Sequence, residues 1–442
     1  IDMVHREVEP GLLTFLLPSY IRVAISETGE LVLPKWLQNA TYGSFVALWI
    51  LGYLAQNGEL LINTILNCKQ KNIPKIPDSL GLFTNLESID LSGNDITELP
   101  DSFCQLSNLK TLDLSHNPIS ILPENIGNLS QLRKITISNG KLIQLPAGFV
   151  SLELLDVIDL SNNALERLPE GFHHLFRLID VDLSGNELSR LPDDFAPLPK
   201  LQKLNISQNS LVELPTNFGD LSRLLEVNLA DNQLEELPYG FGQLEKLKLV
   251  NLCGNSIAGL PQGAERLFCK VQIRQGQPKY SLEFKADPIL MEKLFYLQFL
   301  GLCLAAKENP IRFKHLTKLS FEGKELHRIP QEIESLIYLT QIDLSQNQLD
   351  HLPDGIGKLT SLTTLILSAN QFTQVPICIG RLEKLHRLDL ANNMLSSLPT
   401  EMGKLIEIKE VNLHGNSVTE VPSTMRNLTK LRIVSLDTPQ AA

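Results

Sequence analysis

The sequence has few aromatic residues and fewer basic residues than acidic ones. Phe, Trp and Tyr make up 6% of the 442 residues, and the formal net charge is −11. An acidic chain repels phosphate backbones, and few aromatic rings leave few platforms on which bases could stack. Nucleic acid is therefore not an expected partner.

Long hydrophobic runs are also missing. The run GLLTFLL (Gly11–Leu17) follows Glu7 and Glu9, where a signal peptide would carry a basic segment. The run Phe45–Ala55 is too short to cross a bilayer. We expect neither a signal peptide nor a membrane span. The first residue is Ile1 rather than Met, which is typical of a processed or excised fragment.

Disulfide, metal and catalytic motifs are absent as well. The six cysteines form no CxxC pair and do not cluster, which favours a reducing compartment and predicts a cytoplasmic protein. No HExxH or GxSxG occurs, and GIGKLT (355–360) lacks the upstream glycine of a phosphate-binding loop because position 352 is Leu. We expect no catalytic site, no metal and no cofactor, and so not an enzyme.

The sequence instead contains a motif that repeats every 23 residues, for example LDLSHNPISILPENIGNLSQL at 112–132. An Asn marks most copies, and successive markers differ by 23 or a multiple of it. The markers are Asn94, Asn117, Asn163, Asn186, Asn209, Asn232, Asn255, Asn347, Asn370, Asn393 and Asn416. This periodicity predicts a solenoid, in which each copy is the hydrophobic partner of the next.

Each part of the repeat predicts a local structure. Leu112 and Leu114 point inward and Asp113 outward, as in a short strand, and stacked copies pair into a parallel sheet. The marker Asn is expected to bond to backbone groups of neighbouring turns. Pro123 suits the non-sheet side, where the I-x-x-L-x-x-L spacing predicts short helical or 3₁₀ turns. That side needs more width, so we expect a curved stack with the sheet on its concave face.

From about Leu66 to Leu436 these residues resemble the 23-residue class of intracellular leucine-rich repeats, which share L-x-x-L-D-L-S-x-N-x-L-x-x-L-P. That class includes the Ras–Raf scaffold family, Scribble, Erbin, the plant Ras-group proteins and effectors that bacterial pathogens inject into host cells. The resemblance implies an α/β solenoid, or horseshoe, that binds proteins and catalyses nothing through its repeats. The broken array and the helical preface resemble a bacterial effector most, which would act in the host cytosol.

The repeats occupy two blocks, 66–261 and 316–436, followed by a tail at 437–442. Residues 1–65 carry no repeat. We expect a helical N-terminal cap there, with helices at Thr41–Gln56 and Glu59–Leu66, because a solenoid needs a cover over its first exposed leucines.

Residues 262–315 interrupt the array, and the marker is lost for two periods. Val271 and Ile273 fit a strand. Asp287–Lys307 predicts a helix with Asp287 as N-cap and Pro288 in its first turn. This helical insertion either covers the flank of the solenoid or docks a partner.

The outward residues of the strands form the candidate binding surface. Neighbouring strands lie about 4.8 Å apart, so outward carboxylates repel one another and a partner with a basic patch would relieve that repulsion. Nearby apolar side chains would supply the core of an interface. The predicted partner-binding residues are Asp90, Asp113, Asp156, Asp159, Ile179, Asp180, Asp182, Asn205, Leu225, Asn228, Asn251, Asp343, Ile366 and Asp389. Alternatively, each Asp only aids solubility or bonds to neighbouring strands.

The predicted function is a non-catalytic scaffold or adaptor that binds a partner protein on the concave face. In one alternative the repeats are the substrate-recognition arm of a larger enzyme, such as a ubiquitin ligase or signalling enzyme, with its catalytic domain outside this chain. In another the repeats are structural and bind no specific ligand.

Overall fold

The computed structural model describes residues 64–257 and 283–435, and between and before them 24–25, 31–32, 259–261, 264, 267, 271–274 and 277–280. Two compact units divide the chain, Ile1–Leu234 and Glu235–Ala442. The expected helix Thr41–Gln56 and the tail lie outside the described residues. So does most of the expected helix Glu59–Leu66, whose last two residues belong to a strand instead.

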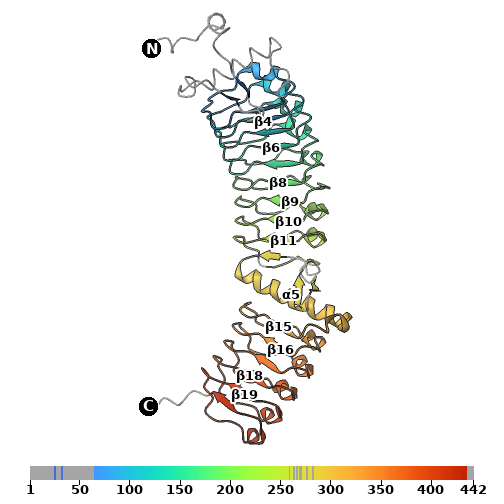
Figure 1. Ribbon diagram of the computed structural model, residues 1–442, viewed down its shortest axis with the longest axis vertical. Coiled ribbons are helices and arrows are strands. Elements are labelled where there is room, and N and C mark those ends of the chain that lie inside the picture. Colours follow the sequence, from blue (N-terminus) through green and yellow to red (C-terminus); the bar gives the residue numbers. More distant parts are fainter. Residues whose placement is uncertain are drawn as a thin grey trace, which may run out of the picture. The chain divides into compact units, whose positions relative to one another are not determined.

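In the first unit, short strands pair in parallel and in register, with an interval of 23 residues between partners (Figure 1). Leu112, for example, pairs with Ile89 on one side and Ile135 on the other. The strands of this sheet are β3 (Ile65–Asn67), β4 (Ser88–Asp90), β5 (Thr111–Asp113), β6 (Lys134–Thr136), β7 (Val157–Asp159), β8 (Asp180–Asp182), β9 (Lys203–Asn205) and β10 (Glu226–Asn228). A separate antiparallel pair joins β1 (Ala24–Ile25) and β2 (Leu31–Val32).

The return paths of the first unit carry the predicted 3₁₀ turns. Most begin directly after the Leu-Pro pair, because Pro needs no hydrogen-bond acceptor for its nitrogen and has a suitable φ. They are η1 (Asp78–Leu82), η2 (Asp101–Gln105), η3 (Glu124–Asn128), η4 (Ala147–Ser151), η5 (Phe172–His174) and η6 (Thr216–Asp220). The sequence prediction of short 3₁₀ turns opposite the sheet is thereby confirmed.

The second unit contains the end of the first repeat block, the insertion and the second block. Its strands are β11 (Leu249–Asn251), β12 (Val271–Arg274), β13 (Gln277–Tyr280), β14 (Glu283–Lys285), β15 (Lys318–Ser320), β16 (Gln341–Asp343), β17 (Thr364–Ile366), β18 (Arg387–Asp389), β19 (Glu410–Asn412) and β20 (Ile433–Ser435). Strands β15 to β20 form one parallel sheet in chain order, and β11 pairs in parallel with β14. Its 3₁₀ helices are η7 (Tyr239–Gln243), η8 (Pro310–Phe313), η9 (Gln331–Ser335), η10 (Asp354–Lys358), η11 (Ile377–Arg381), η12 (Thr400–Lys404) and η13 (Ser423–Asn427).

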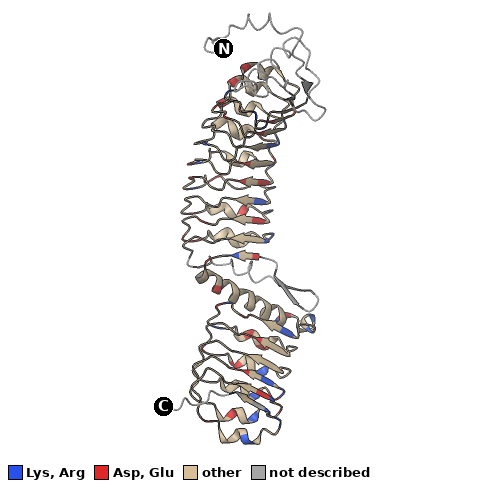
Figure 2. Cartoon of the chain, turned by 60° about the vertical axis from the view of Figure 1, so that its left-hand side comes forward, with Lys and Arg blue, Asp and Glu red and all other residues tan. Residues whose placement is uncertain are grey.

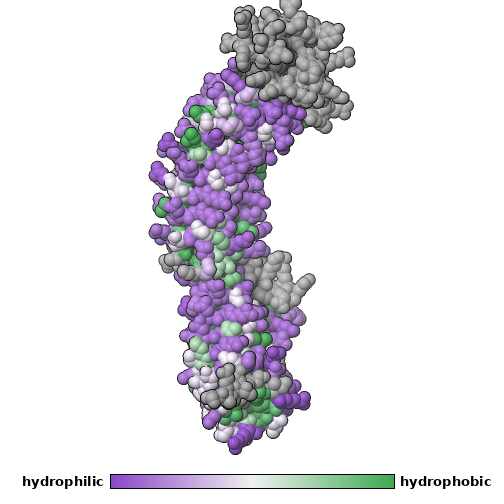
Figure 3. All heavy atoms as spheres, turned by 90° about the vertical axis from the view of Figure 1, so that its left-hand side faces the viewer, coloured by the Kyte–Doolittle hydropathy of each residue, from purple (hydrophilic) through white to green (hydrophobic). Residues whose placement is uncertain are grey.

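The repeat leucines fill the space between strands and turns. Leu112 and Leu114 of β5 and its flank are 1% and 0% exposed, and Phe103 on the return path is fully buried. Burying one such side chain contributes about 1.5–3 kcal/mol, and each repeat buries several. With the leucines inside, hydrophilic residues (purple) cover most of the face shown in Figure 3.

The marker asparagines tie successive repeats together. The side-chain nitrogen of Asn117 donates to the carbonyls of Leu91 and Leu114, and its oxygen accepts from the backbone N–H of Ile96. Asn117 is 2% exposed, so these bonds satisfy polar groups that water cannot reach. The predicted role of the asparagines is confirmed. The residue before the marker has a left-handed backbone, as at Gly93 (φ 68°) and His116 (φ 55°).

The insertion contains the predicted helix as α5 (Pro288–Glu308), with Asp287 at its N-cap position. The Asp287 side chain does not bond to its own helix. Its carboxylate instead accepts from the backbone N–H groups of Gly254 and Asn255 in the last repeat before the insertion. Phe299, Leu302 and Ala306 of α5 are fully buried in the same core as the leucines of the second block. Helix α5 therefore covers the end of that block.

Candidate functional site

Three residues of each repeat form the outward face of the sheet. They are the first and third residues of the strand and the residue directly before the strand. In β7, Ile158 is 1% exposed, whereas Val157 and Asp159 on either side are half-buried. The structure places all fourteen predicted residues in these rows. The third residues of their strands are Asp90, Asp113, Asp159, Asp182, Asn205, Asn228, Asn251, Asp343, Ile366 and Asp389; Asp180 is a first residue, and Asp156, Ile179 and Leu225 directly precede strands.

The column of Asp residues has a local structural role. Oδ1 of Asp113 accepts from the backbone N–H of Ser115 at 2.9 Å and from its hydroxyl at 2.6 Å. The same pair of bonds recurs at Asp90, Asp159, Asp182 and Asp343. The spacing of Asp and Ser in L-D-L-S thus closes a turn after these five strands, and one carboxylate oxygen of each of these Asp residues is already used.

Contacts between strands engage some of the remaining oxygens. Oδ2 of Asp182 accepts from the side-chain amide of Asn205 at 3.0 Å. Oδ1 of Asp389, a residue only 8% exposed, accepts both from the backbone N–H of Ala391 and from the side-chain amide of Asn412 on the next strand. Its Oδ2 lies 3.5 Å from Arg387 of the same strand. These bonds support the alternative in which the column bonds to neighbouring strands.

Basic side chains lie on the same face, and the sequence interpretation missed them. Asp156 is within 3.5 Å of Arg133 and 3.3 Å of Arg177. Lys203 lies 3.4 Å from Glu226. Arg133 and Lys203 hold the same repeat positions as Asp156 and Asp180, so the period could have revealed them. Figure 2 shows both acidic (red) and basic (blue) segments among the strands of the chain.

Asp180 is a half-buried carboxylate in the middle of this charged face. Burial raises its pKa, Lys203 lowers it, and the carboxylates of Asp182, Glu226 and Asp159 raise it further, with a net increase. A basic group brought close to Asp180 would favour its charged form.

Apolar side chains adjoin these acids. Ile179, directly before Asp180, is 37% exposed, and Val157 and Leu225 are half-buried. We define the acidic patch as Asp156, Asp159, Asp180, Asp182 and Glu226. Together with Ile179 it offers charge around a small apolar centre, which is the composition of many protein interfaces.

Comparison with known families identifies the repeats. Two models described as Leucine rich repeat match the chain, one at 66–119, 84–142, 130–188, 169–211 and 314–372 and the other at 384–405. Strand, Asn turn and 3₁₀ return path recur through these same residues. The chain is a leucine-rich-repeat protein. Members of this large group generally bind proteins and other ligands.

Solved leucine-rich-repeat structures resemble this chain over most of its length. A leucine-rich-repeat protein of Leptospira interrogans is 26% identical, with 87% of this chain and 98% of that one covered and a TM-score of 0.49. The ectodomain of the Arabidopsis thaliana receptor kinase GASSHO1/SCHENGEN3 is 24% identical over 86% of this chain and 50% of that one, with a TM-score of 0.45. A search of curated proteins found no match.

Four cysteines of this leucine-rich-repeat protein, Cys68, Cys104, Cys303 and Cys378, are buried in the part of the chain that the structure describes. Burial raises the pKa of Cys68 to about 12 and that of Cys104 to about 11, so both stay protonated thiols at neutral pH. In the described part of the chain, no group of His, Cys, Asp and Glu is arranged to hold a metal ion. No helix among the described residues is both long and apolar enough to cross a membrane.

Proposed function

We propose that this leucine-rich-repeat protein binds a partner protein through the acidic patch and Ile179, on the outward face of β7 to β10. The partner carries a basic patch. The proposal assigns recognition, and no catalysis, to the repeats.

The observation that carries this proposal is the environment of Asp180. Its half-buried carboxylate has three other carboxylates and one lysine nearby, and its pKa is raised. In the patch, Asp156 lies near Arg133 and Arg177 and Glu226 lies near Lys203, so three basic side chains stand against five acids. A cationic side chain from a partner would complete the charge balance, while Ile179 would be covered.

The test is charge reversal at Asp180. Among the described residues, the Asp180 carboxylate makes no hydrogen bond or ion pair on which the fold depends. Wild type and Asp180→Lys are compared in quantitative pull-downs from cell lysate, with Glu124→Lys on the 3₁₀ side of the same unit as matched control. We expect Asp180→Lys to weaken capture of the specific partner about tenfold or more, because like charges then face each other. Glu124→Lys should retain it.

Equal capture by all three proteins would show that the acidic patch is not the binding surface. Loss with both variants would point to a nonspecific effect of net charge. Matched circular dichroism spectra and unfolding midpoints serve as the folding control. Asp159 and Asp182 are less suitable for charge reversal, because their carboxylates close turns.

We further propose a cytoplasmic location, in a scaffold or effector of the intracellular class. The buried thiols of Cys68, Cys104, Cys303 and Cys378, none of which forms a disulfide among the described residues, support a reducing compartment. Labelling of the intact protein in cells with an epitope tag, followed by fractionation, tests the location. Recovery in the secreted fraction would contradict it.

A further inference from the structure

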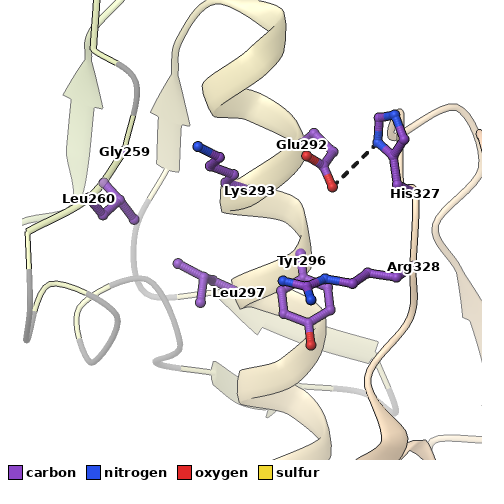
Figure 4. Close-up of a pocket in the computed structure, with 8 residues that line it drawn as sticks. All are labelled: Gly259, Leu260, Glu292, Lys293, Tyr296, Leu297, His327 and Arg328. Atoms are coloured by element: carbon purple, nitrogen blue, oxygen red, sulfur yellow. Dashed lines mark ion pairs between the residues drawn. The ribbon is translucent and has the colours of Figure 1, made fainter. Parts of the chain in front are cut away.

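A groove of about 600 Å³ opens in the second unit beside α5 (Figure 4). Helix α5 contributes Glu292, Lys293 and Tyr296, and the turn after β15 contributes His327 and Arg328. Leu260, at the end of the first repeat block, forms an apolar wall. None of these residues belongs to the outward sheet face.

The groove exists because the insertion replaces regular repeats. Gly259 and Arg328 both stand four residues after a marker position, at Asn255 and Lys324, and three repeat periods separate them. In an unbroken array, intervening turns would fill the space between such residues. Here one helix spans it, and its side chains form the floor.

The Arg328 side chain is held in place by an aromatic ring of α5. Its guanidinium lies over the ring of Tyr296, 4.6 Å from the centroid, and it has no carboxylate partner among the described residues. Stacking restricts the side chain and leaves the edge of the planar donor fork free to bind a carboxylate through two hydrogen bonds. Lys324 is fixed similarly over Phe295 at 4.8 Å.

The net charge of the insertion, residues 262–315, is positive, whereas that of the first repeat block, residues 66–261, is negative. Residues 262–315 contain nine Lys and Arg against five Asp and Glu, whereas 66–261 contain 15 against 25. The acid in the groove, Glu292, lies 3.5 Å from the His327 ring. Lys293 adds positive charge at the rim.

We propose that the groove binds an acidic peptide segment of a partner protein, with an Asp or Glu side chain on Arg328 and an apolar neighbour against Leu260. The groove is a surface feature, because Lys293, His327 and Arg328 are all exposed. A small metabolite would need a deeper enclosure, whereas an extended peptide needs only an open groove with one anchoring contact.

The test is selection of a random peptide-display library on the intact chain, followed by affinity measurement of the enriched peptides as synthetic, fluorescein-labelled probes. We expect enriched peptides to contain Asp or Glu. Arg328→Gln should weaken their binding about tenfold or more, since a charge-assisted bidentate contact is lost. Arg328→Lys, which keeps the positive charge, should retain part of the peptide affinity. Replacing the acidic residue of the peptide with Gln or Asn should have the same effect as Arg328→Gln.

The matched control is Arg190→Gln. Arg190 is exposed and holds the same repeat position as Arg328, but it lies in a regular repeat. Arg190→Gln should leave peptide binding unchanged. Asp180→Lys should also leave it unchanged, which would show that the groove and the outward sheet face bind independently. The proposal is overturned if the library yields no Arg328-dependent peptide. It is also overturned if those peptides keep their affinity without an acidic residue.

Discussion

At the residue scale, two polar side chains of the repeat do different jobs. The marker Asn is buried and bonds to backbone groups of its own turn and of the preceding repeat. The Asp of L-D-L-S is half-exposed and closes the turn after its own strand. Asn205 and Asn228 replace Asp in later repeats and still accept from the residue two positions on, at 3.3 Å in both cases. An amide oxygen therefore suffices for that turn, so closing it does not require the negative charge of the Asp residues.

Replacement of a marker asparagine should cost more than replacement of an exposed one. Asn117→Ala leaves buried backbone groups without partners, at about 1–3 kcal/mol for each. We expect the free energy of unfolding to fall by at least about 2 kcal/mol, measured by urea denaturation. Asn108→Ala, which removes one exposed hydrogen bond to Thr84, is the control and should change it by about 0.5 kcal/mol or less. Equal losses in the two variants would contradict the structural role assigned to the marker.

At the element scale, α5 occupies the position that the return path of a regular repeat would fill. Strand β14 continues the pairing of β11, Asp287 bonds to the turn of the preceding repeat, and the helix buries Phe299 against the second block. The Phe299 ring stacks on Phe321, with centroids 4.3 Å apart. Covering the end of the second block, one of the two roles considered for the insertion, is therefore visible in the structure.

The contribution of α5 to stability can be measured by truncating a buried side chain. Phe299→Ala should lower the free energy of unfolding of the second unit by about 3–5 kcal/mol, because it opens a cavity in a dense core. Leu304→Ala, on the same helix and 40% exposed, should cost much less. Intrinsic tyrosine fluorescence during urea unfolding reports the change. If both substitutions cost the same, α5 does not act as a cover.

At the scale of the whole molecule, stability is distributed along the chain. Each repeat buries its leucines against its immediate neighbours, so a local defect should weaken nearby repeats more than distant ones. This differs from a protein with one central core, in which the whole structure unfolds together.

Hydrogen exchange should reveal this distribution. Phe103→Ala removes a fully buried ring in the first unit. We expect amide protection to fall about tenfold or more in β4 to β6 and to stay within about twofold in β15 to β20. Mass spectrometry of peptic peptides resolves the two regions. A uniform loss across all strands would mean that the units unfold as one, contrary to this expectation.

Much of the fold is determined by the sequence itself. The 23-residue period predicted the paired strands, the Asn turns and the 3₁₀ return paths, and Asp287-Pro288 predicted where α5 begins. These features depend on short-range preferences and on burial of regularly spaced leucines, so one repeat largely specifies the next.

The pairing of side chains was decided only by the tertiary structure. Asp156 looked like part of an uncompensated acidic cluster, yet it lies between Arg133 and Arg177. The sequence pattern does not single out Arg328, and only the structure shows its guanidinium over the ring of Tyr296 in α5. The period fixes which backbone positions are neighbours, but rotamers and the non-repeating insertion determine which side chains meet. Those choices depend on packing in three dimensions, which a one-dimensional pattern does not contain.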